Sequence, residues 1–387
     1  IEGIAAGDLV ESSGEAPRLD VGEGLIGRVV DFGGTPIDGR GPIVGSTVRV
    51  DVAGSIPNPL VRQRIREPLD LGVRALDTML TSGRGQRIGI MAGSGVGKST
   101  LLGMVARGTN ADVVVAGLIG ERGREVREFL EDDLGPDGCA KSCVVVATSD
   151  EPALVRRRAA FTATRIAEHF ADQGMNVLLL LDSLTRVAMA QRDIGLAAGE
   201  PPTTRGYPPS TFSVLPQLLE RAGPREHGSI TGIYAVLVEG DDMNEPVADH
   251  ARSILDGHVV LSRRLAAAGH YPTIDVLQSA SRLATKVQTK EQGEMVQQLR
   301  ALLAAWEDGR DLVEIGAYEP GANAKLDEYI AKQTAIDDFL RQGVGHIEPA
   351  PVAWSRLRDV LDAPVPTPVD AVAPANIALA GPVHTPA

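Results

Sequence analysis

Between about Pro68 and Leu283 the chain alternates continuous apolar runs with segments of helical periodicity. The apolar runs are QRIGIM, DVVVAGLI, SCVVVAT, NVLLLLD and ITGIYAVLVEG. Such runs lack the polar alternation of a half-exposed strand and are typical of parallel strands that helices cover on both faces. The pattern therefore predicts an α/β domain over residues 61–284.

Different patterns flank this domain on both sides. The opening residues are rich in Gly, Val and Asp with a turn signal at DFGGTPIDGR, which predicts short strands of a partial N-terminal β-barrel and a linker over 1–60. Beyond about Thr285, EQGEMVQQLRALLAAWEDGRDLVEIG and AKLDEYIAKQTAIDDFLRQG predict a helical domain over 285–360. The Pro/Ala-rich remainder predicts a disordered tail over 361–387.

Composition and charge limit the function classes. With 43% hydrophobic and 23% charged residues, the chain is typical of a soluble globular protein, and its apolar runs fall short of the about 20 residues that cross a bilayer. The two cysteines and the scattered histidines predict reduced thiols and no zinc site. A net charge of −13 argues against a nucleic-acid partner. The first residues do not resemble a signal peptide, and we expect the chain to begin inside a domain.

A phosphate-binding loop follows the run QRIGIM directly. The stretch AGSGVGKST at 92–100 differs from the strict phosphate-loop pattern only at Ala92, where that pattern has glycine. Its glycines allow backbone N–H groups to surround phosphates, Lys98 can reach the β and γ phosphates, and Ser99 can bind Mg²⁺. The expected nucleotide-binding residues of the loop are Gly93, Ser94, Gly95, Val96, Gly97, Lys98, Ser99 and Thr100.

Two carboxylates stand where strand ends should approach this loop, and a third, Glu125, follows one helical turn after Glu121. Asp182 ends NVLLLLD and Glu121 ends the run DVVVAGLIG, and in a doubly wound sheet the carboxyl ends of the strands face the ligand. We expect Asp182 and Glu125 to serve the metal, Glu121 to polarise the attacking water, and Arg122 to bind the γ-phosphate or to hold Glu121. The alternative is that Asp182 merely marks a strand reaching its loop.

Several motifs together carry a family resemblance. AGSGVGKS, GLIGERGREV, LLLLDSLTR, GEPPTTRGYPPS and PTIDVLQSASR, in this order, resemble the rotary ATPase α/β superfamily, and within it the type III export ATPases of flagella and injectisomes. The resemblance covers about residues 1–345 and implies a RecA-like P-loop core between a partial β-barrel and a C-terminal helical domain.

The resemblance also implies roles for individual residues. It makes Lys98 and Ser99 the phosphate-loop pair, Glu121 the catalytic carboxylate and Asp182 the metal-side aspartate. Arg122 and Arg186 become γ-phosphate ligands. Tyr271 would lie against adenine, and Arg282 would be an arginine finger that enters the neighbouring subunit's site. From the residues alone, Tyr271 is better explained as a half-buried core aromatic, Arg186 as a helix-face charge and Arg282 as a surface arginine. Thr273, where the superfamily usually has Ser, Ala or Pro, is interpreted as a surface-level difference.

The implied function is a Mg²⁺-dependent ATPase motor of a type III export apparatus, most similar to the flagellar one, with the injectisome ATPase and a catalytic β-type subunit of an ATP synthase as alternatives. Glu121 argues against a noncatalytic subunit, and residues 1–60 offer no RNA-binding module.

The resemblance implies a homohexamer, with a monomer as the alternative for a chain that begins inside the barrel. Its implied partners are a central coiled-coil stalk, an N-terminal regulator, export substrates with their chaperones, and a membrane export gate. The implied location is cytoplasmic and peripheral to the inner membrane.

Overall fold

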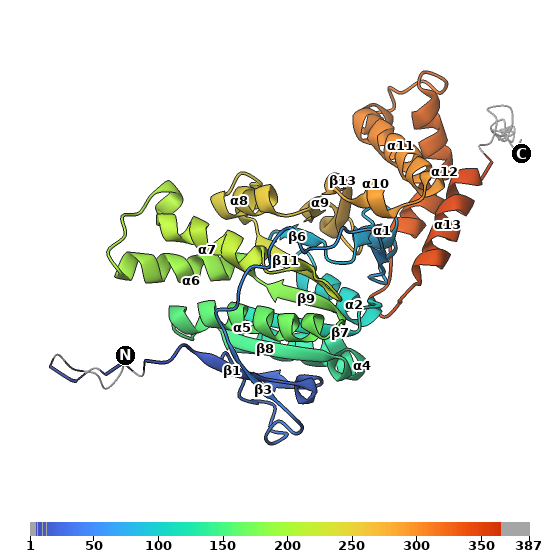
Figure 1. Ribbon diagram of the computed structural model, residues 1–387. Coiled ribbons are helices and arrows are strands. Elements are labelled where there is room, and N and C mark those ends of the chain that lie inside the picture. Colours follow the sequence, from blue (N-terminus) through green and yellow to red (C-terminus); the bar gives the residue numbers. More distant parts are fainter. Residues whose placement is uncertain (1–4, 6, 10, 13, 365–387) are drawn as a thin grey trace, which may run out of the picture.

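The computed structural model describes residues 5, 7–9, 11–12 and 14–364. Figure 1 shows three parts: a small N-terminal sheet, a central sheet between helices, and a helical region at the C-terminal end. The tail predicted from residue 361 falls almost wholly on residues 365–387, outside the described part. The last helix ends at Asp362, two residues beyond the predicted end of the helical domain.

The central sheet contains nine strands and confirms the five buried runs. Its order is β13-β12-β6-β11-β9-β7-β8-β2, with β10 beside β11. All pairs are parallel except β12–β13 and β10–β11. The strands are β2 (Val29–Val30), β6 (Arg87–Ala92), β7 (Val113–Glu121), β8 (Ser142–Thr148), β9 (Asn176–Asp182), β10 (Gly223–Pro224), β11 (Ser229–Leu237), β12 (Gly257–Leu261) and β13 (Ile274–Ser281).

Helices cover both faces of this sheet, as continuous apolar strands require. Buried residues of β7 alternate between two cores: Val114 and Ala116 belong to one, Val113 and Val115 to the other. The helices that accompany the strands are α1 (Arg74–Asp77), α2 (Lys98–Gly108), α3 (Gly123–Glu128), α4 (Gly135–Ala140), α5 (Ala153–Asp172), α6 (Leu184–Ala197), α7 (Pro209–Leu219), α8 (Pro246–Ile254), α9 (Arg263–Ala267) and α10 (Ala284–Val287). A π-helical turn, η2 (Phe129–Leu134), joins α3 to α4, and short 3-10 turns lie at Glu23–Leu25, Thr204–Gly206 and Glu239–Asp241.

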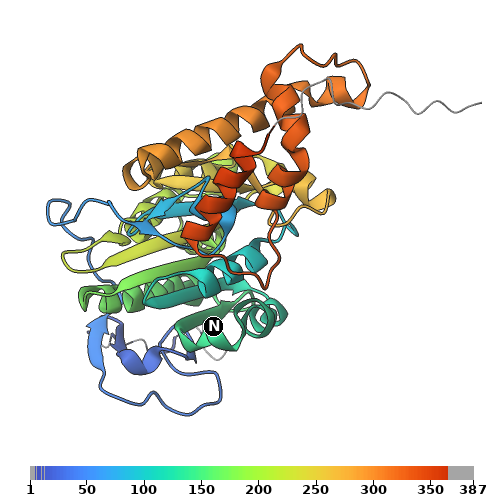
Figure 2. The same cartoon turned by 90° about the vertical axis from the view of Figure 1, so that its right-hand side faces the viewer.

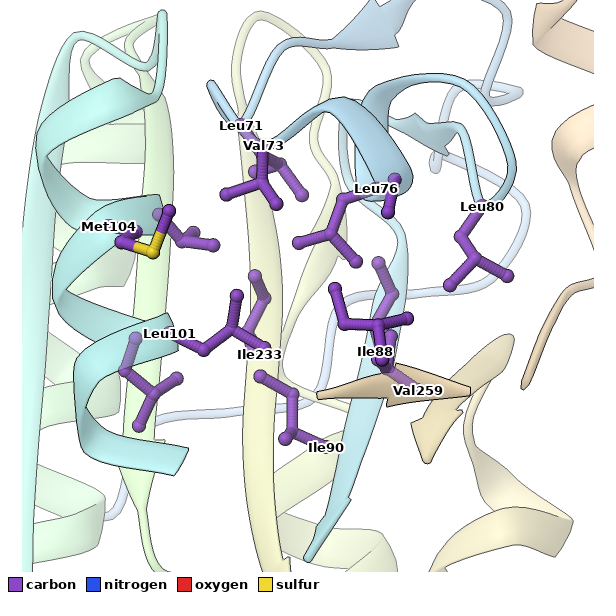
Figure 3. Packing of buried hydrophobic residues seen from close by; sticks show 14 of the residues in the cluster. Leu71, Val73, Leu76, Leu80, Ile88, Ile90, Leu101, Met104, Ile233 and Val259 are labelled. Atoms are coloured by element: carbon purple, nitrogen blue, oxygen red, sulfur yellow. The ribbon is translucent and has the colours of Figure 1, made fainter. Parts of the chain in front are cut away.

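Helix α2 is fixed to the sheet through the first of these cores. Its Leu101 and Met104 belong to the same buried cluster as Ile90 of β6 and Ile233 of β11 (Figure 3). Leu101 is 1% exposed and Met104 4%. Because α2 and β6 are packed together, the loop that joins them is held between two rigid elements.

The N-terminal and C-terminal regions lie at opposite ends of the molecule (Figure 2). β1 (Arg18–Val21) pairs antiparallel with β3 (Val48–Asp51), so the predicted short strands are present. β4 (Pro68–Leu69) and β5 (Ser82–Gly83) form a second small sheet. The helical region consists of α11 (Lys290–Glu314), α12 (Ala324–Leu340) and α13 (Ala350–Asp362). Within the described residues, no helix combines the length and apolarity needed to cross a membrane.

Candidate functional site

The phosphate-binding loop joins β6 to α2 as predicted. β6 ends at Ala92 and α2 begins at Lys98. Gly95 and Gly97 have φ angles of 76° and 88°, a left-handed backbone that glycine adopts without steric cost. The first turn of α2 directs its unpaired N–H groups and the positive end of its dipole toward the loop, which is a general anion-binding arrangement.

Three predicted side chains meet beside this loop. The Lys98 ammonium donates to Asp182 Oδ1 and lies 3.8 Å from Glu121 Oε1. Their side chains are only 11%, 4% and 14% exposed, respectively. The meeting follows from the topology, since β7 and β9 are neighbours and Leu118 pairs with Asp182 at their carboxyl ends.

Glu121 is turned toward the loop by an irregularity in its strand. The register between β7 and β8 shifts between Ile119 and Glu121, as in a β-bulge that redirects a side chain. Burial raises the pKa of the Glu121 carboxyl to about 7; the charge of Asp182 and a hydrogen bond with Glu125 add to this rise, and Lys98 opposes it. A carboxyl group with a pKa near neutrality is suited to accept a proton in a reaction.

Gly120, in the middle of this irregularity, allows Arg186 to lie across the strand end. Its φ angle is 73°. A Cβ atom at Gly120 would lie 3.0 Å from Arg186 Cβ and 3.1 Å from Arg186 Cγ. The Nε atom of Arg186 is buried and has no hydrogen-bond partner within the described residues. The Arg186 side chain therefore lies against the residue before Glu121, and both residues line the same cavity.

Replacing Gly120 with alanine is expected to lower both stability and turnover. The left-handed backbone would cost about 1–2 kcal/mol with a side chain, and displacement of Arg186 and Glu121 would reduce kcat about 10- to 100-fold. The measurements are thermal unfolding and steady-state kinetics. Gly123→Ala is the matched control, because a Cβ atom there would contact nothing within 4 Å. Equal turnover in the two variants would contradict the prediction.

The predicted residues Arg122, just before α3, and Glu125, in its first turn, lie at the rim of the site. Arg122 has a 73% exposed side chain and donates to Glu125 Oε1 at 2.9 Å. The pKa of Glu125 is lowered, first by its hydrogen bond with Glu121 and further by the neighbouring Arg122. Arg122 therefore reaches the centre of the site only if its side chain leaves Glu125.

A cavity of about 800 Å³ joins these groups. Its lining includes the predicted Gly93, Ser94, Gly95, Gly97, Lys98, Ser99, Thr100, Glu121, Arg122, Glu125 and Arg186. It also includes residues for which we predicted no role, notably Arg192, Arg205, Glu245 and Arg263. Arg263 follows the end of β12, so the rule that strand ends face the ligand could have identified it had GHVVL been recognised as a strand. Arg205 lies in the 3-10 turn Thr204–Gly206 and pairs with Asp242 at 2.8 Å.

Two of the predicted nucleotide-binding residues, Val96 of the loop and Tyr271, do not line this cavity. The Tyr271 side chain is half exposed, and a Cβ atom at Gly97 would lie 3.9 Å from its ring. Val96 is buried, and its carbonyl accepts a 2.7 Å hydrogen bond from the Thr273 hydroxyl. Our interpretation of Thr273 as a surface-level difference is wrong, because its side chain is 2% exposed and bonded to the phosphate loop.

Arg282 lies at the opposite edge of the sheet. At the start of β13, Ile274 pairs with Leu261, which pairs in turn with Ala92 beside the loop. At its end, Ser281 pairs with Gly257 at the start of β12. Arg282 follows Ser281, is exposed and donates to the Arg252 carbonyl at 3.1 Å. The topology therefore separates Arg282 from the site of its own chain.

The residues predicted to serve Mg²⁺ fit a metal that is held mainly by phosphate oxygens and water. Ser99 and Lys98 line the cavity, and Asp182 accepts a hydrogen bond from Lys98. The described residues contain no group of three His, Cys, Asp or Glu side chains able to hold a metal ion by themselves. Mg²⁺ usually needs no such cage, because it keeps several waters and binds one or two protein ligands together with substrate phosphates.

Comparison with known families agrees with this geometry. Residues 72–281 match the model of the ATP synthase alpha/beta family, nucleotide-binding domain. Residues 288–359 match the T3SS EscN ATPase C-terminal domain. The flagellum-specific ATP synthase of Bacillus subtilis (strain 168) is 55% identical over 347 residues, which are 90% of this chain and 78% of that protein. The type 3 secretion system ATPase of Xanthomonas euvesicatoria is 51% identical over 340 residues, 88% of this chain and 77% of that protein.

Solved structures agree as well. The assembled ATPase EscN from the enteropathogenic E. coli type III secretion system superposes with a TM-score of 0.88 at 46% identity, covering 93% of this chain and 87% of that chain. EscN in complex with its central stalk EscO superposes with a TM-score of 0.87 at 46% identity and the same coverage of both chains.

Proposed function

Since this chain belongs to the ATP synthase α/β family and, within it, to the ATPases of type III protein export, we propose that it hydrolyses ATP in the cavity behind its phosphate loop. The observation that supports this site most directly is the convergence of Lys98, Glu121 and Asp182 at adjacent strand ends. A cation for phosphate, a carboxylate for water and a carboxylate for a metal are the groups that phosphoryl transfer requires.

In the proposed mechanism, side chains and backbone amides of this chain position the ATP triphosphate and the attacking water. The loop amides and Lys98 bind the triphosphate, and Arg186 adds a positive charge where the γ-phosphate oxygens would lie. Glu121 orients the attacking water and accepts its proton, for which a pKa of about 7 is suitable. Arg122 would join the γ-phosphate after leaving Glu125.

We further propose that Mg²⁺ accompanies the nucleotide. Ser99 and Asp182 would hold it, and Glu125 would contact its water shell. The metal supplies positive charge that offsets the charge on the transferred phosphoryl group. Binding of metal would require Lys98 to leave Asp182 and turn toward the phosphates.

We propose that the working form is a homohexamer around a central stalk. EscN has been solved as an assembled ATPase and in complex with a central stalk. In a ring, the Arg282 side chain would extend across the subunit interface and complete the neighbouring site. An N-terminal regulator, export substrates with their chaperones, a membrane export gate, and a cytoplasmic position at the inner membrane remain proposals from the family resemblance. The flagellar apparatus remains our prediction, since the flagellar relative is 55% and the injectisome relative 51% identical.

The test is specific ATPase activity against protein concentration, with sedimentation velocity on the same samples. Activity per subunit is expected to rise steeply as rings form, because a site completed by a second subunit is incomplete in the monomer. Activity that stays constant while the sedimentation coefficient reports a growing fraction of rings would contradict catalysis between subunits. Absence of ATP binding at any concentration would contradict the proposed site itself.

A further inference from the structure

Gln342, outside the cavity, joins three separate parts of the molecule. It lies just after α12 and is 5% exposed. Its backbone N–H donates to the Tyr271 carbonyl at 2.9 Å. Its side-chain amide donates to the carbonyls of Gly72 at 2.8 Å and His346 at 2.7 Å, and its side-chain oxygen accepts from the Arg74 N–H at 2.9 Å. All hydrogen-bonding atoms of this side chain are thus directed to fixed backbone groups.

Tyr271, whose carbonyl accepts the bond from the Gln342 backbone N–H, supports the phosphate loop. The ring of Tyr271 lies against Gly97, at the start of α2. Two residues later, Thr273 donates to the carbonyl of Val96. The turn 271–273 is thus bonded to Gln342 at one end and to the phosphate loop at the other.

The region around Gln342 is itself anchored to the core. Arg74, at the start of α1, is 4% exposed, and its guanidinium donates to the carbonyls of Asp338, Phe339 and Arg341 and to Glu348. The carboxyl end of α12 is therefore fixed to the N-terminal residues of the α/β domain. The side chain of Gln342 adds to this connection, because it bonds Gly72 and Arg74 in the same N-terminal segment of the domain.

We propose that Gln342 is a positioning residue for nucleotide binding, which acts by holding the Tyr271 turn against the phosphate loop. This inference rests on the proposed function of the cavity. Without the side chain of Gln342, the segment after α12 loses its bonds to the Gly72 carbonyl and the Arg74 backbone N–H. The Arg74 guanidinium still holds the preceding carbonyls, but the backbone N–H that donates to the Tyr271 carbonyl loses its nearest support. Because none of these bonds reaches Glu121 or Lys98, the effect falls on nucleotide affinity rather than on the chemical step.

The test compares Gln342→Ala and Gln342→Met with a matched control, Lys332→Met. The methionine variant keeps the side-chain volume and removes only the hydrogen bonds. Lys332 is also 5% exposed; it bonds Glu328 within α12 and joins α12 to α13 through the Leu361 carbonyl. It has no bond to the Tyr271 turn in the described residues. We measure kcat and KM for ATP, the Kd for ADP by calorimetry, and thermal unfolding of each variant.

Both Gln342 variants are expected to raise KM for ATP and Kd for ADP about tenfold, with kcat changed by less than about twofold, a size of effect found for residues coupled through a shared contact. Lys332→Met should lower the unfolding temperature without changing either constant. In a Tyr271→Ala, Thr273→Val background, Gln342→Met should change KM no further, because both contacts of the turn with the phosphate loop are already removed.

Two results would overturn the inference. One is an equal rise of KM in Lys332→Met, which would assign the effect to general destabilisation of the helical region. The other is a full additional rise of KM when Gln342→Met is combined with Tyr271→Ala and Thr273→Val, which would mean that Gln342 acts by another route. Failure of the wild-type protein to bind ADP would instead refute the proposed site, so the two failures are distinguishable.

Discussion

Replacing Glu121 with glutamine is expected to lower ATP turnover about 100- to 10,000-fold, the usual contribution of a general base, and to leave ATP binding largely intact. The amide has the same shape but cannot accept a proton from the attacking water. Binding should persist because Lys98 keeps its place on the loop, with Asp182 as its nearer carboxylate partner. The loss should therefore appear in kcat.

This prediction is tested by calorimetric titration with ATP and by steady-state turnover of the same preparation. Glu128→Gln is a suitable control, since Glu128 also lines the cavity but pairs with the exposed Arg124 at its rim. The control should keep turnover within a few-fold of the parent protein. Loss of ATP binding in Glu121→Gln would remove Glu121 from the chemical step and make it a binding residue.

The centre of the site could be predicted because two local patterns determine it. The phosphate loop is a continuous stretch of sequence, and its conformation depends on glycines at 95 and 97 that are visible in the sequence. Glu121 and Asp182 each end an apolar run, and parallel strands bring their carboxyl ends to one edge of a sheet. No knowledge of strand order was needed to expect them near the loop.

The surroundings of the site could not be predicted in the same way, because they depend on contacts between distant segments. Thr273 and Val96 are bonded across 177 positions of the chain, and Gln342 and Gly72 across 270. Neither Thr273 nor Gln342 differs in its local pattern from an ordinary polar residue at the end of an element. Only tertiary contacts identify them: for Thr273 the packing of the turn before β13 on the phosphate loop, and for Gln342 the packing of the helical region against the α/β domain.

Replacing Arg282 with alanine is expected to lower turnover about 10³- to 10⁵-fold, the usual contribution of an arginine supplied by a neighbouring subunit. The topology excludes a role for Arg282 within its own subunit, because β13 runs antiparallel and carries Arg282 away from the edge that bears the phosphate loop. A large loss of activity therefore requires a second subunit. Arg358→Ala is the control, since Arg358 is also exposed but pairs with Glu291 in the helical region.

Mixing two inactive variants separates this mechanism from simple destabilisation. Arg282→Ala subunits keep an intact phosphate loop and Glu121, whereas Glu121→Gln subunits keep an intact Arg282. In a mixed ring, each Arg282→Ala site that faces a Glu121→Gln neighbour contains every catalytic group, so activity should reappear although neither variant alone is active. Mixed rings that sediment as assemblies yet remain inactive would rule out donation of Arg282 between subunits. Recovered activity would follow only from a site built by two chains, because no single subunit in the mixture carries both residues.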